Sequence, residues 1–128
     1  MTITLLKSKL HRVRITQAEL YYEGSITIDH DLLDRSGILP YEKVHVVNVN
    51  NGARLETYTI PGPRGGGGIC MNGPAARLVS VGDEVIVIAY CDLSTEEALA
   101  HRPKAFFFND LNQITGALSF NPTEELTV

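Results

Sequence analysis

The stretch that decides the fold reads Val44-His-Val-Val-Asn-Val-Asn-Asn-Gly-Ala-Arg-Leu-Glu-Thr-Tyr-Thr-Ile60. Residues 44–49 and 54–60 are rich in β-branched side chains, and such runs favour strands. They flank Asn50-Asn51-Gly52, and Asn-Gly suits the positive φ angles of a tight hairpin turn. The stretch therefore predicts a β-hairpin in a β-rich protein.

Similar short patterns continue on both sides of this hairpin. Further strands are expected at 5–15 (with Leu10, Val13 and Ile15 inward), 25–28, 69–71, 85–90 and 106–108. The unbroken Val-Ile-Val-Ile-Ala run from Val85 predicts burial on both faces. Many short strands with scattered helical turns predict a mainly β fold, a compact barrel.

Two short helices are expected between the strands. Residues 31–36 read as helical turns ended by a left-handed Gly37. Ser94-Thr-Glu-Glu97 is a capping-box pattern that predicts a helix over 95–100. The polar tail from Asn121 is expected to be loose.

Length and composition set the class of protein. The 128 residues fit a single domain, 1–128, and 44% hydrophobic with 20% charged residues is globular composition. The charge, 11 − 15 = −4, favours neither nucleic acid nor anionic lipid as partner. No run is long enough for a leader or a membrane span. Cys70 and Cys91 are too few for a disulfide framework. We expect a cytoplasmic protein with two free thiols.

Two other features carry little chemistry. The tract 65–68 is all glycine but lacks the Lys-Ser/Thr of a P-loop and the spacing of a dinucleotide motif, so a flexible hairpin connection is expected. The four histidines are scattered. Glu97 and His101, at i and i+4, are expected to pair on the surface, and two ligands make no metal site.

Gly24-Ser25, in Tyr21-Tyr-Glu-Gly-Ser25, has one chemical possibility beyond a turn. Glycine permits strained backbone geometry, and the serine hydroxyl can attack the preceding carbonyl. The N→O acyl shift gives an ester, and β-elimination followed by hydrolysis leaves an N-terminal pyruvoyl group.

The chain resembles the pyruvoyl-dependent aspartate 1-decarboxylase family in the order and spacing of several short motifs. The resemblance runs from about residue 7 to 90 and more weakly beyond. The motifs are Lys9-Leu-His-Arg12, Tyr22-Glu-Gly-Ser25, Gly37-Ile-Leu39, Asn51-Gly52, Arg54, Thr57-Tyr58, Asn72-Gly73 and Val81-Gly-Asp83.

The resemblance implies a double-psi β-barrel that assembles as a homotetramer with active sites between subunits. It implies self-cleavage between Gly24 and Ser25, which gives a 1–24 β-chain and a 25–128 α-chain. Ser25 becomes the covalent pyruvoyl cofactor, which forms a Schiff base with L-aspartate. The product is β-alanine for pantothenate synthesis. Whether cleavage is spontaneous or needs a helper protein, as in some members, stays open.

The same resemblance implies the role of each matched residue. Arg54 holds a substrate carboxylate, and Lys9 is the second cation. Tyr58 donates the proton, since a phenol is protonated at neutral pH. Thr57 contacts substrate and hydrogen-bonds the Gly24 carbonyl during cleavage.

The substrate pocket is matched by Asn72, Gly73, Pro74 and Ala75, with His11 and Tyr22 as secondary candidates. Many members carry alanine where Pro74 stands, and proline cannot donate a backbone N–H. Pocket hydrogen bonds are then left to the two residues that flank it. Some relatives also carry Ser and Arg within the glycine tract.

Several alternatives remain at this point. Strand alternation places Arg54, Glu56 and Tyr58 on one face and Thr57 on the other. For both Thr57 and Tyr58 to reach one site, the strand must twist, bulge or lie at an interface. The rival functions are a non-catalytic β-barrel binding module and a hydrolase with an unrecognised triad.

Overall fold

The computed structural model describes residues 1–124, and the statements below concern those residues. Most of the chain is in strands. In chain order the elements are β1 (Thr2–Arg14), β2 (Gln17–Glu19), β3 (Ser25–Asp29), α1 (His30–Ser36), β4 (Lys43–Asn48), β5 (Arg54–Gly62), β6 (Ile69–Asn72), the 3₁₀ helix η1 (Gly73–Leu78), β7 (Glu84–Ser94), α2 (Thr95–Ala100), β8 (Lys104–Phe108) and β9 (Ile114–Ser119). The prediction of a mainly β fold is confirmed, and β2 and β9 are strands that the sequence patterns missed.

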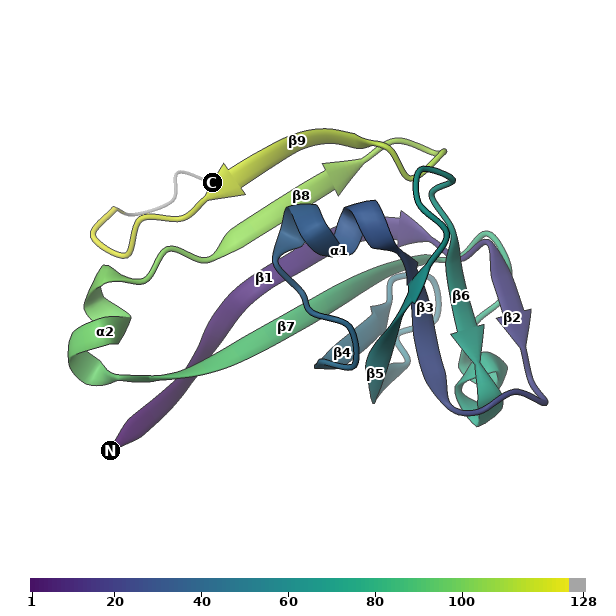
Figure 1. Ribbon diagram of the computed structural model, residues 1–128, viewed down its shortest axis with the longest axis horizontal. Helices are drawn as coiled ribbons and strands as arrows, with labels where there is room; N and C mark the ends of the chain where they lie inside the picture. The colour runs from purple at the N-terminus through teal and green to yellow at the C-terminus, as the bar shows by residue number, and fades with distance from the viewer. Residues whose placement is uncertain (125–128) are drawn as a thin grey trace.

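The strands of this described part form one mixed sheet in the order β2-β6-β3-β5-β4-β7-β1-β8-β9. Three neighbouring pairs run parallel: β1 with β8, β2 with β6, and β3 with β5. The long β1 and β7 pair antiparallel, with irregularities after Leu6 and His11 that bend the ribbon (Figure 1). The sheet brings the start of β3 between β5 and β6.

The predicted hairpin is present as β4 and β5. They pair from Lys43 with Tyr58 to Val47 with Arg54. Gly52 supplies the positive φ of the turn, +76°, and its N–H donates to the carbonyl of Asn48 at 2.9 Å. The predicted hairpin is therefore confirmed, with Gly52 at the strained position. Its turn is wider than the expected tight Asn-Gly turn, because it spans residues 49–52 and Asn51 does not share the positive φ.

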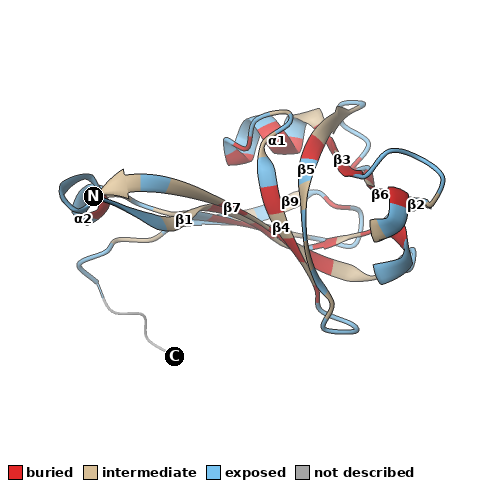
Figure 2. Cartoon of the chain, turned by 90° about the horizontal axis from the view of Figure 1, so that it is seen from below, coloured by how far each residue is buried: buried red, intermediate tan, exposed pale blue. Residues whose placement is uncertain are grey.

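The core lies where the strands cross beneath α1 (Figure 2). Leu10, Val13 and Ile15 point inward as predicted, each at most 1% exposed. The prediction that β7 is buried on both faces is wrong. Its buried residues are Val85, Val87 and Ala89, whereas Ile86, Ile88 and Tyr90 between them are only partly covered. One face of β7 packs on the core, and no second layer formed by residues 1–124 buries the other.

Both predicted helices form, with the expected caps. Gly37 ends α1 at φ +74°, and the Ser94 and Glu97 side chains make the full capping box of α2. The predicted surface pair of Glu97 and His101 is wrong. Glu97 is engaged by the backbone N–H of Ser94, and the His101 ring lies 2.8 Å from the carbonyl of Leu6.

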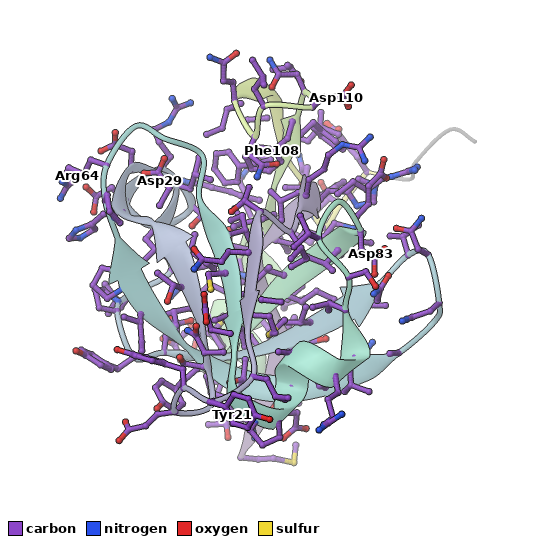
Figure 3. The ribbon with its side chains drawn as sticks, turned by 90° about the vertical axis from the view of Figure 1, so that its right-hand side faces the viewer. Tyr21, Asp29, Arg64, Asp83, Phe108 and Asp110 are labelled. Atoms are coloured by element: carbon purple, nitrogen blue, oxygen red, sulfur yellow. The ribbon has the colours of Figure 1, made fainter. Side chains whose placement is uncertain are left out.

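The glycine tract is neither a hairpin connection nor unrestrained. It joins β5 to β6, which flank β3 instead of pairing with each other. The Asp29 carboxylate accepts hydrogen bonds from the N–H groups of Gly65 and Gly67 at 2.9–3.1 Å. Figure 3 shows Asp29 and Arg64 at this loop, with Tyr21 at the opposite end of the molecule. Asp29 therefore pins the loop at the far end of β3.

The tail that was expected to be loose lies only partly within the described residues. Between 121 and 124 the chain makes a turn in which the N–H of Glu124 donates to the carbonyl of Asn121 at 3.1 Å. Residues 125–128 lie outside the described part.

Candidate active site at the start of β3

Four polar side chains share one face where β3 meets β6. The antiparallel register sets Ser25 opposite Asn72 and Thr27 opposite Cys70. Because side chains alternate along a strand, positions two apart lie on the same face. Ser25 and Asn72 are buried, at 0% and 3% exposed, whereas the other two are half-buried. The four residues form a compact polar cluster beside the Gly24–Ser25 bond, which we call the β3–β6 cluster.

Asn72 is the centre of this cluster. Its Nδ2 donates to the Ser25 hydroxyl at 2.8 Å and to the Thr27 hydroxyl at 2.9 Å. Its Oδ1 lies 3.2 Å from the Cys70 sulfur. The Ser25 hydroxyl also lies 3.4 Å from the carbonyl oxygen of Glu23. A nucleophilic oxygen is thus held in a fixed position next to the preceding peptide bond.

Gly73 brings the start of η1 against the segment that precedes Ser25. Its φ is +72°, a conformation that strains any residue with a Cβ. A Cβ there would lie 2.8 Å from the Cα of Gly24 and 2.9 Å from the carbonyl oxygen of Tyr22. The close approach therefore requires glycine at 73. Pro74 follows at the first turn of η1, where its missing N–H costs nothing.

We expect Gly73→Ala to displace the Tyr22–Ser25 segment, because both contacts are with backbone atoms that cannot rotate away. If the chain cuts itself after Gly24, the variant should do so at least about tenfold more slowly, the effect of about 1.4 kcal/mol of added strain. The split fraction is followed by intact mass against time. Gly66→Ala is the matched control, since a Cβ at Gly66 meets no atom within 4 Å. Equal rates for the two variants would show that Gly73 has no such role.

Tyr58 and Thr57 directly precede the residues of β5 that pair in parallel with β3. Ile26 pairs with Thr59, so counting back one residue sets Ser25 beside Tyr58, and counting back two sets Gly24 beside Thr57. Tyr58 is 36% exposed and Thr57 lies on the other face of β5. The pairings of β5 show no register shift. The pairing of β5 with β4 therefore has no bulge between Arg54 and Tyr58, whereas just beyond it Tyr41 and Glu42 both bond to Thr59.

The two predicted cations lie away from Ser25 within one chain. Arg54 is four residues from Tyr58, about 13 Å along the strand. Its guanidinium lies 3.0 Å from His45 Nδ1 and 3.2 Å from the Tyr90 hydroxyl. Lys9 pairs with Ile88 on β1 and β7, and three strands separate β1 from β3 in the sheet. In the strand pairings of one copy, neither cation is a direct neighbour of Ser25.

A polar hollow opens near Arg54. It encloses about 290 Å³ and its lining includes His45 and Tyr90, both partners of Arg54. Lys43 also lines it, and its ammonium lowers the pKa of the Glu56 carboxyl by a direct hydrogen bond. The residues of the lining are Thr4, Lys43, His45, Tyr90, Cys91 and Asp92. Its lining carries the cation Lys43 and the anion Asp92, and it does not include the β3–β6 cluster.

The two secondary candidates differ in their surroundings. Burial lowers the pKa of His11, and the neighbouring Lys9 and Arg12 charges lower it further. Its ring packs edge-on against Phe107, with the centroids 5.5 Å apart. Tyr22 is 61% exposed, and its carbonyl oxygen lies against Gly73.

Thr27 and Cys70 were missed in the sequence analysis although a signal was present. Each lies two residues from a residue that was singled out, Ser25 or Asn72, and period-two alternation puts such residues on one face. Cys70 and Cys91 are both free thiols, as expected. Between residues 1 and 124 no three His, Cys, Asp or Glu side chains gather as a metal site would need. No helix of that range is long and apolar enough to cross a bilayer.

Known proteins match this chain over nearly all of its length. A model of the aspartate decarboxylase family matches residues 1–115. The chain belongs to the aspartate decarboxylase family. It is 57% identical to the aspartate 1-decarboxylase of Salinibacter ruber over 125 residues, which cover 98% of this chain and 86% of that protein. It is 60% identical to the aspartate 1-decarboxylase of Carboxydothermus hydrogenoformans over 114 residues, which cover 89% of this chain and 90% of that protein.

The aspartate 1-decarboxylase of Bacillus subtilis is 55% identical over 123 residues, which cover 96% of this chain and 97% of that protein. The family resemblance recognised from short motifs is therefore confirmed, and the match extends beyond the range of about 7–90 in which those motifs lie.

Proposed function

We propose that this protein is an aspartate 1-decarboxylase, a lyase that releases CO2 from L-aspartate and leaves β-alanine. The observation that carries this function is the match of nearly the whole chain to aspartate 1-decarboxylases at 55–60% identity. It favours an enzyme over a binding module, and a lyase over a hydrolase. We place the reaction in the cytoplasm, in the supply of β-alanine for pantothenate.

We further propose that the chain matures by cutting itself between Gly24 and Ser25. The Ser25 hydroxyl attacks the Gly24 carbonyl carbon to form an ester. β-Elimination then releases the Gly24 carboxylate and leaves a dehydroalanine at residue 25. Water hydrolyses this group with release of ammonia, which leaves a pyruvoyl end on residues 25–128. A buried hydroxyl held by Asn72 and next to the bond to be broken supports this step. When present, the pyruvoyl group supplies a ketone that captures the substrate amine and accepts the electron pair left by CO2.

The β3–β6 cluster suits such a group, because Asn72 offers an amide N–H at the Ser25 side chain. Asn72 is the residue that would hold it. Tyr58, next to Ser25 in the register, is the proton donor to the substrate carbon. Thr57, next to Gly24 in the register, holds the Gly24 carbonyl during cleavage. The backbone of Gly73 and Ala75 lines the substrate pocket, with Pro74 making no donor contribution.

Arg54 and Lys9 bind the carboxylates of the substrate. Since a single copy separates both from Ser25, we propose that a second copy brings them to the site. The half-covered face of β7 is an apolar surface suited to such an assembly. The proposed assembly is a homotetramer of double-psi β-barrels, and the three parallel strand pairs of the mixed sheet support that topology.

An intact mass spectrum of the purified protein tests this maturation. We expect two fragments, residues 1–24 and 25–128, the second ending in a pyruvoyl group. Borohydride added with aspartate should leave a permanent mass increase on the 25–128 fragment, and borohydride alone should not add the substrate's mass. A single intact chain that makes no β-alanine would sink the proposal. Incubating the isolated precursor alone shows whether a helper protein is needed.

A further inference from the structure

We propose that Cys70 is a positioning residue for the cleavage of the Gly24–Ser25 bond, because its thiol orients the amide of Asn72. The Cys70 S–H donates to Asn72 Oδ1 and thereby directs the amide NH₂ toward Ser25 and Thr27. This inference rests on the self-cleavage proposed above and adds a residue to the same site.

The geometry of β6 leaves the thiol one good acceptor. Cys70 and Asn72 are two residues apart on one strand, so their side chains lie on the same face. The sulfur is 3.2 Å from Asn72 Oδ1, and its other acceptor, the Met71 carbonyl oxygen, is more distant at 3.9 Å. Asn72 is 3% exposed, so solvent offers its amide oxygen little competition. The Cys70 thiol is thus the side-chain donor to Asn72 Oδ1 among the described residues.

The thiol keeps its proton at neutral pH. Burial raises the pKa of Cys70, and the nearby Glu19 carboxylate raises it further. A protonated thiol is a hydrogen-bond donor, whereas a thiolate could only accept. The charge state of Cys70 therefore suits an amide whose oxygen, not its nitrogen, faces the sulfur.

The orientation of the amide decides what the Ser25 hydroxyl can do. With the NH₂ toward it, Asn72 donates to the oxygen and leaves the hydroxyl hydrogen free to point at the Glu23 carbonyl, 3.4 Å away. A second lone pair then remains for the Gly24 carbonyl carbon. A flipped amide would present its oxygen and draw the hydroxyl hydrogen toward Asn72.

The step itself is balanced without any further reactant. The bond from Ser25 Oγ to the Gly24 carbonyl carbon forms, and the bond from that carbon to the Ser25 nitrogen breaks. The hydroxyl proton ends on the Ser25 nitrogen. Cys70 exchanges no atom or electron in this step and acts only through Asn72.

The test follows the splitting of freshly synthesised full-length chain by intact mass. Cys70→Ala removes the donor, and we expect splitting to slow about fivefold, the effect of one ordinary hydrogen bond. Cys70→Ser restores a donor and should split within about twofold of the parent rate. Cys91→Ala is the matched control, since Cys91 pairs with Leu5 on the long β1–β7 ribbon. Melting temperatures of uncleaved Ser25→Ala versions separate a loss of positioning from a loss of folding.

A double-mutant cycle with Asn72→Ala gives the decisive comparison. If Cys70 acts through Asn72, Cys70→Ala should change nothing further once the amide is absent. If the parent chain splits, three results would each overturn the inference. The first is a double variant in which the slowing by Cys70→Ala multiplies that by Asn72→Ala. The others are a parent rate for Cys70→Ala and equal slowing by Cys70→Ala and Cys70→Ser. A parent chain that never splits would instead overturn the proposed self-cleavage, and this inference with it.

Discussion

A chain that carries Ser25→Ala is expected to stay in one piece and to make no β-alanine. The substitution removes the proposed nucleophile, the hydroxyl oxygen that Asn72 holds at 2.8 Å. Without the acyl shift no ester forms, and without the ester no pyruvoyl end appears. The expected loss of activity is therefore complete. Intact mass and an assay for β-alanine measure the two outcomes on one sample.

Ser8→Ala is the matched control for this variant. Ser8 is also a buried strand serine, 1% exposed, and its hydroxyl has no hydrogen-bond partner within residues 1–124. Its removal leaves no polar partner unsatisfied, so this variant should split and turn over aspartate like the parent. Should Ser25→Ala still yield a fragment that ends at Gly24, the acyl-shift mechanism is wrong.

For Tyr58→Phe we expect normal splitting but a fall in kcat of about 10²–10⁴-fold, the usual worth of general acid catalysis. The substitution keeps the ring and removes only the donor proton. Extending the β3–β5 register by one residue sets Tyr58 beside Ser25, and Tyr58 is 36% exposed, so a substrate can reach it. Trapping of aspartate by borohydride should survive, because it precedes the proton transfer. The measurement is kcat and KM on fully split protein.

Two further variants show whether the effect is specific to the Tyr58 hydroxyl and to the chemical step. Tyr41→Phe is the matched control, because the Tyr41 ring stacks on Tyr58 at 6.5 Å and loses the same hydroxyl. Arg54→Lys keeps the charge but loses the planar fork, so it should raise KM more than it lowers kcat. A parent rate for Tyr58→Phe would move the proton donor elsewhere, and Tyr22 would be the next candidate.

The sequence by itself determined the features that depend on a few neighbouring residues. The hairpin turn at Gly52, the left-handed end of α1 at Gly37 and the capping box of Ser94 were all predicted and are all present. Each is set by hydrogen bonds and φ preferences within about five residues, and these depend directly on the residue types present. The family could also be recognised from the sequence, because motifs such as Tyr22-Glu-Gly-Ser25 are defined by residue order and spacing alone.

Only the tertiary structure decided which distant residues meet. Ser25 and Asn72 are 47 positions apart, and the pairing of β3 with β6 that joins them is written in neither strand alone. The role of Cys70 depends on that pairing. The half-covered face of β7 was misjudged for the same reason. A strand's hydrophobic pattern says which side chains avoid water, but the layer that covers them is chosen by the packing of the whole sheet.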